Sequence, residues 1–363
     1  MVRGIAALAV MLGHVRGLFF VAYSQVMNRT TLVGTAYLLT SLGHQAVIVF
    51  FVLSGFFISR SVLDSFWRRR WSWKVFLVNR LTRLLLVLLP GLLLCALWDR
   101  LGMRLPAAAT FYYHSIPQFN AGIIAANASV RVFAGNLFFL QSIFFPSFGS
   151  DFPLWSLSYE FWYYLLFPMV LAVLAFHGPL TRRLAYALAA SAIIVMVGRE
   201  VALLFLVWLA GGGVGLLHDW RPQASPGMSA AWTSPAFGGA CLAGLCFVRM
   251  RAPEGLASDL LAAAAFLPAM YVLVRASGSD LYRPYATTAK LLASFSYTLY
   301  VVHLPVLILL RTLLGRIPRW QPDFRHAVFG LGLALLVTAY ALAVSHFTEA
   351  RTDAVRRAIL RRL

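Results

Sequence analysis

Residues 42–63 read LGHQAVIVFFVLSGFFISRSVL, an almost unbroken run of apolar side chains. As an α-helix, a run of this length is long enough to cross a hydrocarbon core of about 30 Å. Only helices and closed β-barrels can span lipid, and this run does not alternate apolar with polar residues as a barrel strand does. The stretch therefore predicts a transmembrane helix.

Comparable runs recur along the chain, which has 363 residues, 61% of them hydrophobic and only 12% charged. A soluble domain cannot bury that much apolar surface. The sequence therefore predicts an all-α fold, a polytopic transmembrane helical bundle of about ten helices. The predicted spans lie near residues 2–21, 42–63, 81–99, 154–176, 184–199, 201–217, 229–248, 257–274, 291–314 and 327–347.

The charge of the chain is strongly positive, with a net charge of +19. In a soluble protein this charge would indicate binding to nucleic acid, but in a membrane protein it indicates basic loops at the membrane surface. A basic cluster lies between the second and third predicted spans: Arg68, Arg69, Arg70, Lys74, Arg80 and Arg83. By the positive-inside rule this loop is cytoplasmic, which places both termini in the cytoplasm. Arg249 and Arg251 then lie outside and count against the topology.

One apolar segment, near residues 132–146, is too short for a full crossing and is predicted to be re-entrant or interfacial. If it crossed, every later loop would change sides and the arginines of the C-terminal tail would lie outside. With this segment excluded, residues 1–350 are predicted to form one transmembrane domain and residues 351–363 a basic cytoplasmic tail.

Familiar site motifs are missing from the sequence. Cys95, Cys241 and Cys246 lie within or beside apolar segments without paired spacing, so neither a disulfide framework nor a metal site is expected. The chain also lacks a G-x-S-x-G elbow, a Walker A loop and an H-E-x-x-H motif. A reaction of the standard serine hydrolase or ATPase kind is therefore not expected.

Ionisable residues at membrane depth are costly and usually face a cavity or a partner, so they are the first candidates for function. Arg3 and His14 share the first predicted span and are separated by roughly 16 Å along a helix axis. Arg3 would lie at the cytoplasmic surface, where it suits phosphate, and His14 near the midplane, where it can act as a general base. A hydrogen-bonded core histidine beside an ordinary positive-inside arginine explains the same spacing equally well.

Arg80 and Arg83 are a second candidate, an i, i+3 pair at the start of the third predicted span. Such a pair can clamp a phosphate-rich ligand. It can equally snorkel to lipid headgroups, and spacing alone leaves both roles open.

Two later spans add further candidates. Glu160 is the clearest acidic residue inside an apolar segment, and a carboxylate there needs a partner such as His14, Arg3 or a sugar hydroxyl. Tyr300 and His303 are three residues apart, share a helix face and place a second histidine near mid-membrane. A structural hydrogen bond between helices is the alternative for this pair.

Six short motifs occur in one order across this hydropathy pattern. They are Arg3-x10-His14, FFVLSGF at 50–56, NRLTR at 79–83, Gly135-Asn136-Leu137 with Gln141, PLWSLSYE at 153–160 and SYTLYVVH at 296–303. Each is weak alone, but together they resemble the acyltransferase 3 family of bacterial membrane acyltransferases. The resemblance runs from Arg3 to about His303.

The resemblance implies a multi-pass protein of the bacterial cytoplasmic membrane. It also implies transfer of an acyl group, usually acetyl, from cytoplasmic acyl-CoA (acetyl-CoA) to a hydroxyl of an extracytoplasmic or membrane-linked carbohydrate. No metal is expected. In the family, the residue matching His14 is catalytic, the one matching Glu160 lies at the acceptor side, and arginines handle the donor, here Arg3, Arg80 and Arg83.

These roles lead to a mechanistic hypothesis. His14 takes the proton from the acceptor hydroxyl as it attacks the thioester, with Glu160 or His303 orienting the imidazole or the sugar. A relay through a transient acyl-histidine would use the same residues and stays open. The residues expected to contact the substrate are Trp155, Ser156 and Tyr300.

Other functions and partners stay open at this point. A transporter of a sugar, lipid or acyl donor would use the same polar cavity, and a structural or sensor protein without turnover is a third reading. Some relatives carry a fused extracytoplasmic esterase domain, which is not found in this sequence. The membrane domain is therefore expected to complete transfer itself or to pass acyl groups to a separate extracytoplasmic acyltransferase. A homo-oligomer is a further expected assembly. Acyl-CoA, a carbohydrate or glycolipid acceptor and membrane lipids are the expected partners, and nucleic acid is not.

Overall fold

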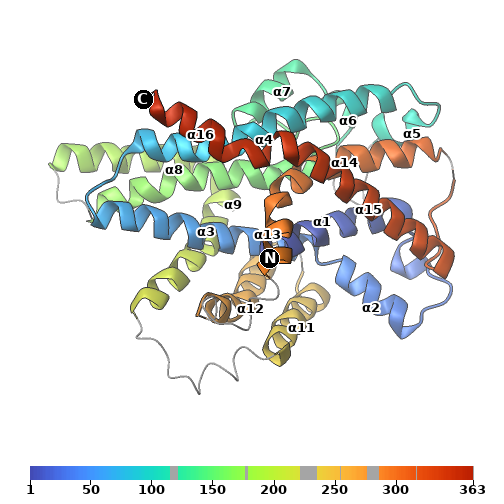
Figure 1. The fold of residues 1–363 in the computed structure, drawn as a ribbon. Coiled ribbons are helices and arrows are strands. Elements are labelled where there is room, and N and C mark those ends of the chain that lie inside the picture. Colours follow the sequence, from blue (N-terminus) through green and yellow to red (C-terminus); the bar gives the residue numbers. More distant parts are fainter. Residues whose placement is uncertain are drawn as a thin grey trace. The chain divides into compact units, whose positions relative to one another are not determined.

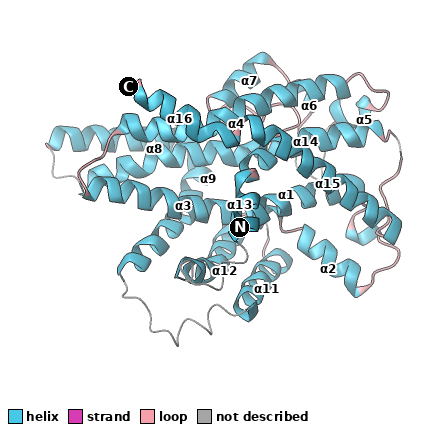
Figure 2. Cartoon of the chain, viewed as in Figure 1, coloured by secondary structure: helices cyan, strands magenta, loops and turns pink. Residues whose placement is uncertain are grey.

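The computed structural model describes residues 1–114, 122–175, 179–220, 235–253, 255–275, 286–315 and 317–362. These residues lie almost entirely in helices and the turns that join them, and their β-structure is limited to two isolated bridges (Figure 2). Eight helices in the described ranges are long and apolar enough to cross a membrane. The all-α, polytopic fold predicted from the sequence is confirmed.

The chain divides into two compact units that alternate along the sequence. The first unit comprises Met1–Gly43, Trp73–Ser158 and Thr288–Leu363, and the second comprises His44–Ser72 and Tyr159–Thr287. Most predicted site residues lie in the first unit, namely Arg3, His14, Arg80, Arg83, Trp155, Ser156, Tyr300 and His303. Glu160 belongs to the second unit, so it is described separately.

The central helix of the first unit is α14 (Ser296–Leu313), which is buried over most of its length. Figure 1 shows α14 beside the helices that pack on it, α1 (Val2–Phe19), α4 (Trp73–Gly102) and α15 (Phe324–Phe347). Gly91 allows α4 to approach closely, because a Cβ there would overlap the side chain of Val301 on α14. The polar side chains of α14 consequently face other helices of this unit.

In the second unit, α3 (Gly43–Trp67) packs against α9 (Leu180–Trp220) through small residues on both helices. A Cβ at Gly55 would overlap the carbonyl oxygen of Trp208, and a Cβ at Gly211 would overlap a carbonyl oxygen of α3. Small residues let helix backbones approach closely in membranes, where packing rather than the hydrophobic effect drives helix association. These contacts fix α9 beside the FFVLSGF motif of α3.

Several predicted spans have different ends in the structure. The third predicted span begins much earlier, because α4 extends back to Trp73 through part of the basic cluster. The spans predicted at 184–199 and 201–217 lie within α9, which is interrupted at Gly198, where φ is +82°. A positive φ of this kind favours glycine, which explains why the break falls there.

Two more predicted spans differ from the helices observed. The span predicted at 291–314 is divided at Phe295 into α13 (Ala286–Ser294) and α14. Of the span predicted at 229–248, residues 229–234 lie outside the described residues, and the rest is α11 (Pro235–Arg251). The other helices are α2 (Thr31–Thr40), α5 (Ala108–Tyr112), α6 (Ile124–Asn127), α7 (Val130–Leu137), α8 (Trp155–Ala175), α12 (Leu256–Arg275) and α16 (Thr352–Arg361), with 3-10 turns η1 (Tyr23–Gln25), η3 (Phe152–Leu154) and η5 (Glu349–Arg351).

The segment near 132–146 does not cross a bilayer as a helix. Its helix, α7, has eight residues and would be only about 12 Å long. Buried amides hold the segment in place: Asn136 Nδ2 donates to the carbonyls of Val132 and Pro146, at 2.8 and 2.9 Å. Gln141 Nε2 donates to the carbonyl of Leu154 at 2.9 Å. The asparagine and glutamine of this motif therefore fix the loop that leads into α8.

Candidate active site

Two histidines that are 289 positions apart in the sequence meet inside the first unit. His14 Nδ1 on α1 lies 2.8 Å from His303 Nε2 on α14, and the two rings stack with their centroids 5.0 Å apart. His303 is completely buried, whereas His14 is partly exposed. The sequence marked both residues separately as candidates, and the structure joins them into one pair.

The contacts of the His303 ring determine which nitrogen of His14 is basic. His303 Nδ1 lies 2.9 Å from the carbonyl oxygens of Leu299 and of Tyr300. Because a carbonyl only accepts hydrogen bonds, Nδ1 carries the proton, and Nε2 of a neutral His303 is an acceptor. His14 Nδ1 must then donate to it, which leaves His14 Nε2 as the unprotonated nitrogen.

In this arrangement His14 can act as a catalytic base, and His303 is the partner that orients its ring. In hydrolase triads a second side chain accepts a hydrogen bond from one histidine nitrogen and so fixes the tautomer in which the other can take a proton. Here His303 supplies that acceptor, and two backbone carbonyls fix His303 in turn. The pair can hold and move a proton at His14 Nε2.

The predicted substrate contacts Ser156 and Tyr300 are joined to each other in the first unit. Tyr300 OH donates to the Pro153 carbonyl at 2.9 Å and lies 2.6 Å from Ser156 Oγ. Both side chains are buried. The geometry therefore ties the start of α8 to α14 one turn from His303, and direct contact of either residue with substrate stays a prediction. Trp155, the first residue of α8, is partly exposed.

Arg3, Arg80 and Arg83 are all partly buried near the end of the first unit that is predicted to face the cytoplasm. The Arg80 guanidinium lies over the Phe76 ring, 5.5 Å from its centroid. Burial raises the pKa of the Glu349 carboxyl above its usual value, while hydrogen bonds from Thr298 and the positive charges of Arg3 on α1 and Arg83 on α4 oppose that rise. The structure thus gathers two of the three predicted donor arginines around an acidic residue that the sequence analysis missed.

Glu160 has its partners within the second unit. Ser54 Oγ donates to Glu160 Oε1 at 2.7 Å, and Tyr164 OH donates to the same oxygen. Trp208 Nε1 on α9 donates to Ser54 Oγ at 3.3 Å. The sequence predicted a histidine, an arginine or a sugar hydroxyl as the partner of the Glu160 carboxylate. In the structure its partners are instead Ser54 of the FFVLSGF motif and Tyr164, one turn further along α8. A direct role of Glu160 in catalysis stays a prediction.

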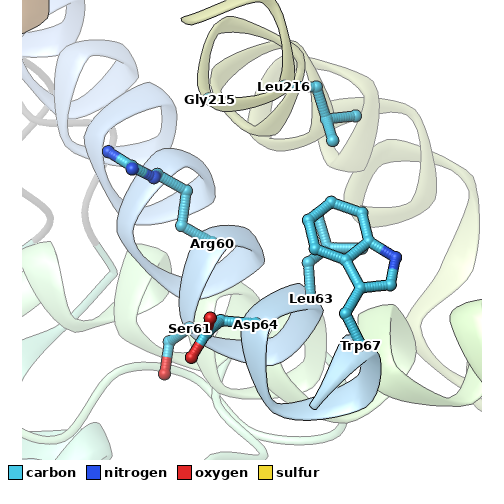
Figure 3. Close-up of a pocket in the computed structure, with 7 residues that line it drawn as sticks. All are labelled: Arg60, Ser61, Leu63, Asp64, Trp67, Gly215 and Leu216. Carbon is cyan, nitrogen blue, oxygen red and sulfur yellow. The ribbon is translucent and has the colours of Figure 1, made fainter. Parts of the chain in front are cut away.

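A pocket of about 310 Å³ lies in the second unit at the end of α3 (Figure 3). In Figure 3 the indole of Trp67 and the side chain of Leu216 line facing sides, and the Arg60 guanidinium points away from Asp64. Asp64 accepts a hydrogen bond from Arg68 Nε at 2.6 Å. Tryptophan and arginine at the end of a transmembrane helix are typical of the membrane interface, and no predicted site residue lines this pocket.

The first unit also contains a buried acidic pair that the sequence analysis missed. Asp99, near the end of α4, accepts hydrogen bonds from the backbone N and Oγ of Ser150, at 2.9 and 2.6 Å. Asp151 is completely buried, and neither of its carboxylate oxygens has a hydrogen-bond partner among the described residues. Asp99 stands out in the sequence as a charge in an apolar run, whereas nothing there indicates that Asp151 is buried.

Replacing Asp151 by asparagine is expected to stabilise the protein increasingly as the pH rises. Burial, and then the charge of Asp99, raise the pKa of Asp151 well above its usual value. The folded state therefore keeps a proton that the unfolded state loses above about pH 4, so this residue lowers stability as the pH rises toward its folded pKa. Asparagine carries no such penalty.

Thermal unfolding of purified wild-type protein and Asp151→Asn, from about pH 5 to about pH 8, measures this effect. The melting temperature of the variant should exceed that of wild type by a margin that grows with pH. A constant difference, or one that shrinks with pH, would mean that Asp151 is ionised in the folded protein.

Comparison with known proteins agrees with this geometry. A family model described as an acyltransferase domain, of the acyltransferase 3 type, matches residues 1–343. The chain belongs to the acyltransferase 3 family. No curated protein and no solved structure matches it significantly. The histidine pair described above is therefore part of a membrane acyltransferase. The matched region includes the second unit, the first unit up to residue 343 and every predicted site residue.

Proposed function

We propose that this acyltransferase transfers an acyl group, acetyl in the simplest case, from cytoplasmic acyl-CoA to a hydroxyl of an extracytoplasmic or membrane-linked carbohydrate. The observation that carries the proposal is the His14–His303 pair. It gives a partly exposed imidazole on a transmembrane helix a defined tautomer with a basic nitrogen. A transfer from thioester to alcohol requires such a base.

The transfer can proceed in one step at His14. Nε2 takes the proton of the acceptor hydroxyl while the oxygen attacks the thioester carbonyl carbon. The tetrahedral intermediate collapses, the C–S bond breaks, and the sulfur of CoA takes up the proton from the imidazolium. His303 accepts the hydrogen bond from His14 Nδ1 throughout and stabilises the cation that forms. A relay through an acylated His14 would use the same nitrogen and remains the alternative route.

The donor would enter from the cytoplasmic end, where its phosphates meet arginine side chains. Guanidinium groups form charge-assisted, bidentate hydrogen bonds with phosphate. Arg3 and His14 share α1, so the same helix can hold the phosphates at one end and the reacting base in its interior. Support for the donor class comes from this charge distribution and from the family, in which acyl groups are transferred.

A transporter is the rival function, and the fate of the thioester separates the two. Purified protein in liposomes is supplied with acetyl-CoA labelled in the acetyl group and with glycolipids extracted from bacterial envelopes. We expect free CoA thiol to form in equal amount with labelled glycan. Movement of intact acetyl-CoA or glycolipid across the bilayer without thiol release would instead identify a transporter.

A further inference from the structure

The pocket at the end of α3 lies within the second unit, where the apolar run of this helix meets the basic loop (Figure 3). By the positive-inside rule this end of the helix is predicted to face the cytoplasm. Trp67, the last residue of α3, is 65% exposed. An exposed tryptophan at the end of a membrane helix indicates the depth of the lipid headgroups, so the pocket is expected to open among the headgroups of the inner leaflet.

The space for the Arg60 side chain in this pocket depends on glycine in α9. A Cβ at Gly215 would lie only 2.9 Å from Cγ of Arg60, closer than real Cβ atoms come to a neighbour. A Cβ at Gly212 would likewise lie 2.9 Å from Oγ of Ser59, one residue earlier on α3. The small residues let the two helices approach closely, so the stem of Arg60 packs beside the backbone of α9. Both helices therefore define where the guanidinium lies.

The two sides of the pocket differ in character, as Figure 3 shows. The polar side chains on one side are Arg60, Ser61 and Asp64, and the apolar side chains on the other are Leu63, Trp67 and Leu216. The volume of about 310 Å³ is at the lower end of the range for small-molecule pockets, roughly 300–1,000 Å³. The pocket therefore has room for a polar headgroup and the first carbons of an attached chain, but not for a whole CoA molecule.

The charge around the pocket is positive. The stretch from Arg60 to Arg70 contains four arginines and one acidic residue, Asp64. Asp64 accepts a hydrogen bond from Arg68 Nε at 2.6 Å, so its charge is compensated within the stretch. Guanidinium groups form bidentate, charge-assisted hydrogen bonds with phosphate, and the cytoplasmic leaflet presents anionic lipids at this depth. The charge therefore favours a headgroup with a net negative charge over a zwitterionic one.

We propose that the pocket binds one anionic phospholipid of the inner leaflet. Arg60 holds its phosphate, Ser61 donates a hydrogen bond to a phosphate oxygen, and the start of an acyl chain covers Trp67 and Leu216. A soluble phosphate compound would leave that apolar side exposed to water, so a lipid is the better occupant. Because the lining residues come from α3 and α9, the bound lipid stabilises the packing of these two helices. No predicted site residue lines the pocket, so the lipid site does not depend on the reaction proposed above.

Three variants separate a built pocket from general attraction to the membrane surface. Arg60→Gln removes the charge and the fork of donors, and Arg60→Lys keeps the charge but loses the bidentate geometry. Arg70→Gln is the matched control, because it removes one exposed arginine from the same end of the second unit, and Arg70 does not line the pocket. Diffuse attraction would respond equally to the loss of either arginine, whereas the pocket responds to the loss of Arg60.

Native mass spectrometry of purified, delipidated protein in a neutral detergent measures the affinity of the first phosphatidylglycerol molecule bound. We expect Arg70→Gln to bind it like wild type, Arg60→Gln about tenfold more weakly, and Arg60→Lys with an affinity between the two. Phosphatidylcholine with the same chains should bind wild-type protein about tenfold more weakly than phosphatidylglycerol. Added phosphatidylglycerol should raise the melting temperature of wild type more than that of Arg60→Gln, and inorganic phosphate or CoA should not displace the lipid.

Four results would overturn the proposal. An equal loss of affinity in Arg60→Gln and Arg70→Gln would mean diffuse attraction instead of a site. Folded Arg60→Gln that binds phosphatidylglycerol like wild type would remove the pocket from lipid binding. Equal binding of phosphatidylcholine to wild type, which needs no variant, would show that the phosphate charge is not recognised. Displacement of the lipid by inorganic phosphate or CoA would assign the pocket to a soluble phosphate compound.

Discussion

Replacing His14 by alanine is expected to lower kcat for acyl transfer by roughly 10³-fold, because it removes the nitrogen that takes the proton of the acceptor hydroxyl. The remaining rate would come from holding the two substrates together. Donor binding should persist, since the arginines near the end predicted to face the cytoplasm are untouched. Acetyl transfer to envelope glycolipids, with CoA binding measured in parallel, tests both parts of this expectation.

His346→Ala provides the matched control for that experiment. His346 lies on α15 in the same unit as His14 but is exposed. This control should retain wild-type activity and CoA binding. If His14→Ala kept more than about a tenth of the wild-type kcat, His14 would not be the general base of this reaction.

Replacing His303 by leucine is expected to lower kcat by roughly 10² to 10⁴-fold, although His303 itself need not touch either substrate. The loss of its Nε2 frees His14 to adopt the other tautomer, in which Nε2 carries a proton and cannot act as a base. His303→Gln is the informative companion, since its amide oxygen can accept the hydrogen bond from His14 Nδ1.

The pattern across the two His303 variants distinguishes orientation from packing. Glutamine should restore part of the activity that leucine loses, while KM for acetyl-CoA changes little in either variant. Leucine that retains wild-type kcat would show that His303 does not set the tautomer of His14. Thermal unfolding of both variants, measured alongside, corrects for any loss of folded protein.

Long-range contacts set the limit of what the sequence could predict. Apolar runs located the helices, because a membrane requires each span to satisfy its own backbone hydrogen bonds. The same rule says little about breaks within apolar sequence, so the division at Phe295 was not anticipated, and the break predicted at residue 200 falls at Gly198 instead. Gly198, two positions away, was the available signal for the break in α9.

The candidate site could be predicted in parts but not as a whole. His14 and His303 stood out because histidine in a span is costly, yet no periodicity relates residues on the first and ninth predicted spans. Glu349 lies beyond the last predicted span, next to the basic tail, where an acidic residue is ordinary. Only the fold reveals that it caps α14 and lies near Arg3 and Arg83.

The protonation of the His14 ring is the point on which the catalytic proposal depends, and nitrogen-15 NMR measures it directly. Protein labelled at its eight histidines is compared with His14→Gln and His303→Gln to assign the two rings. At neutral pH we predict a proton on Nδ1 of His14, none on its Nε2, and a proton on Nδ1 of His303. A protonated Nε2 on His14 would contradict its assignment as the general base.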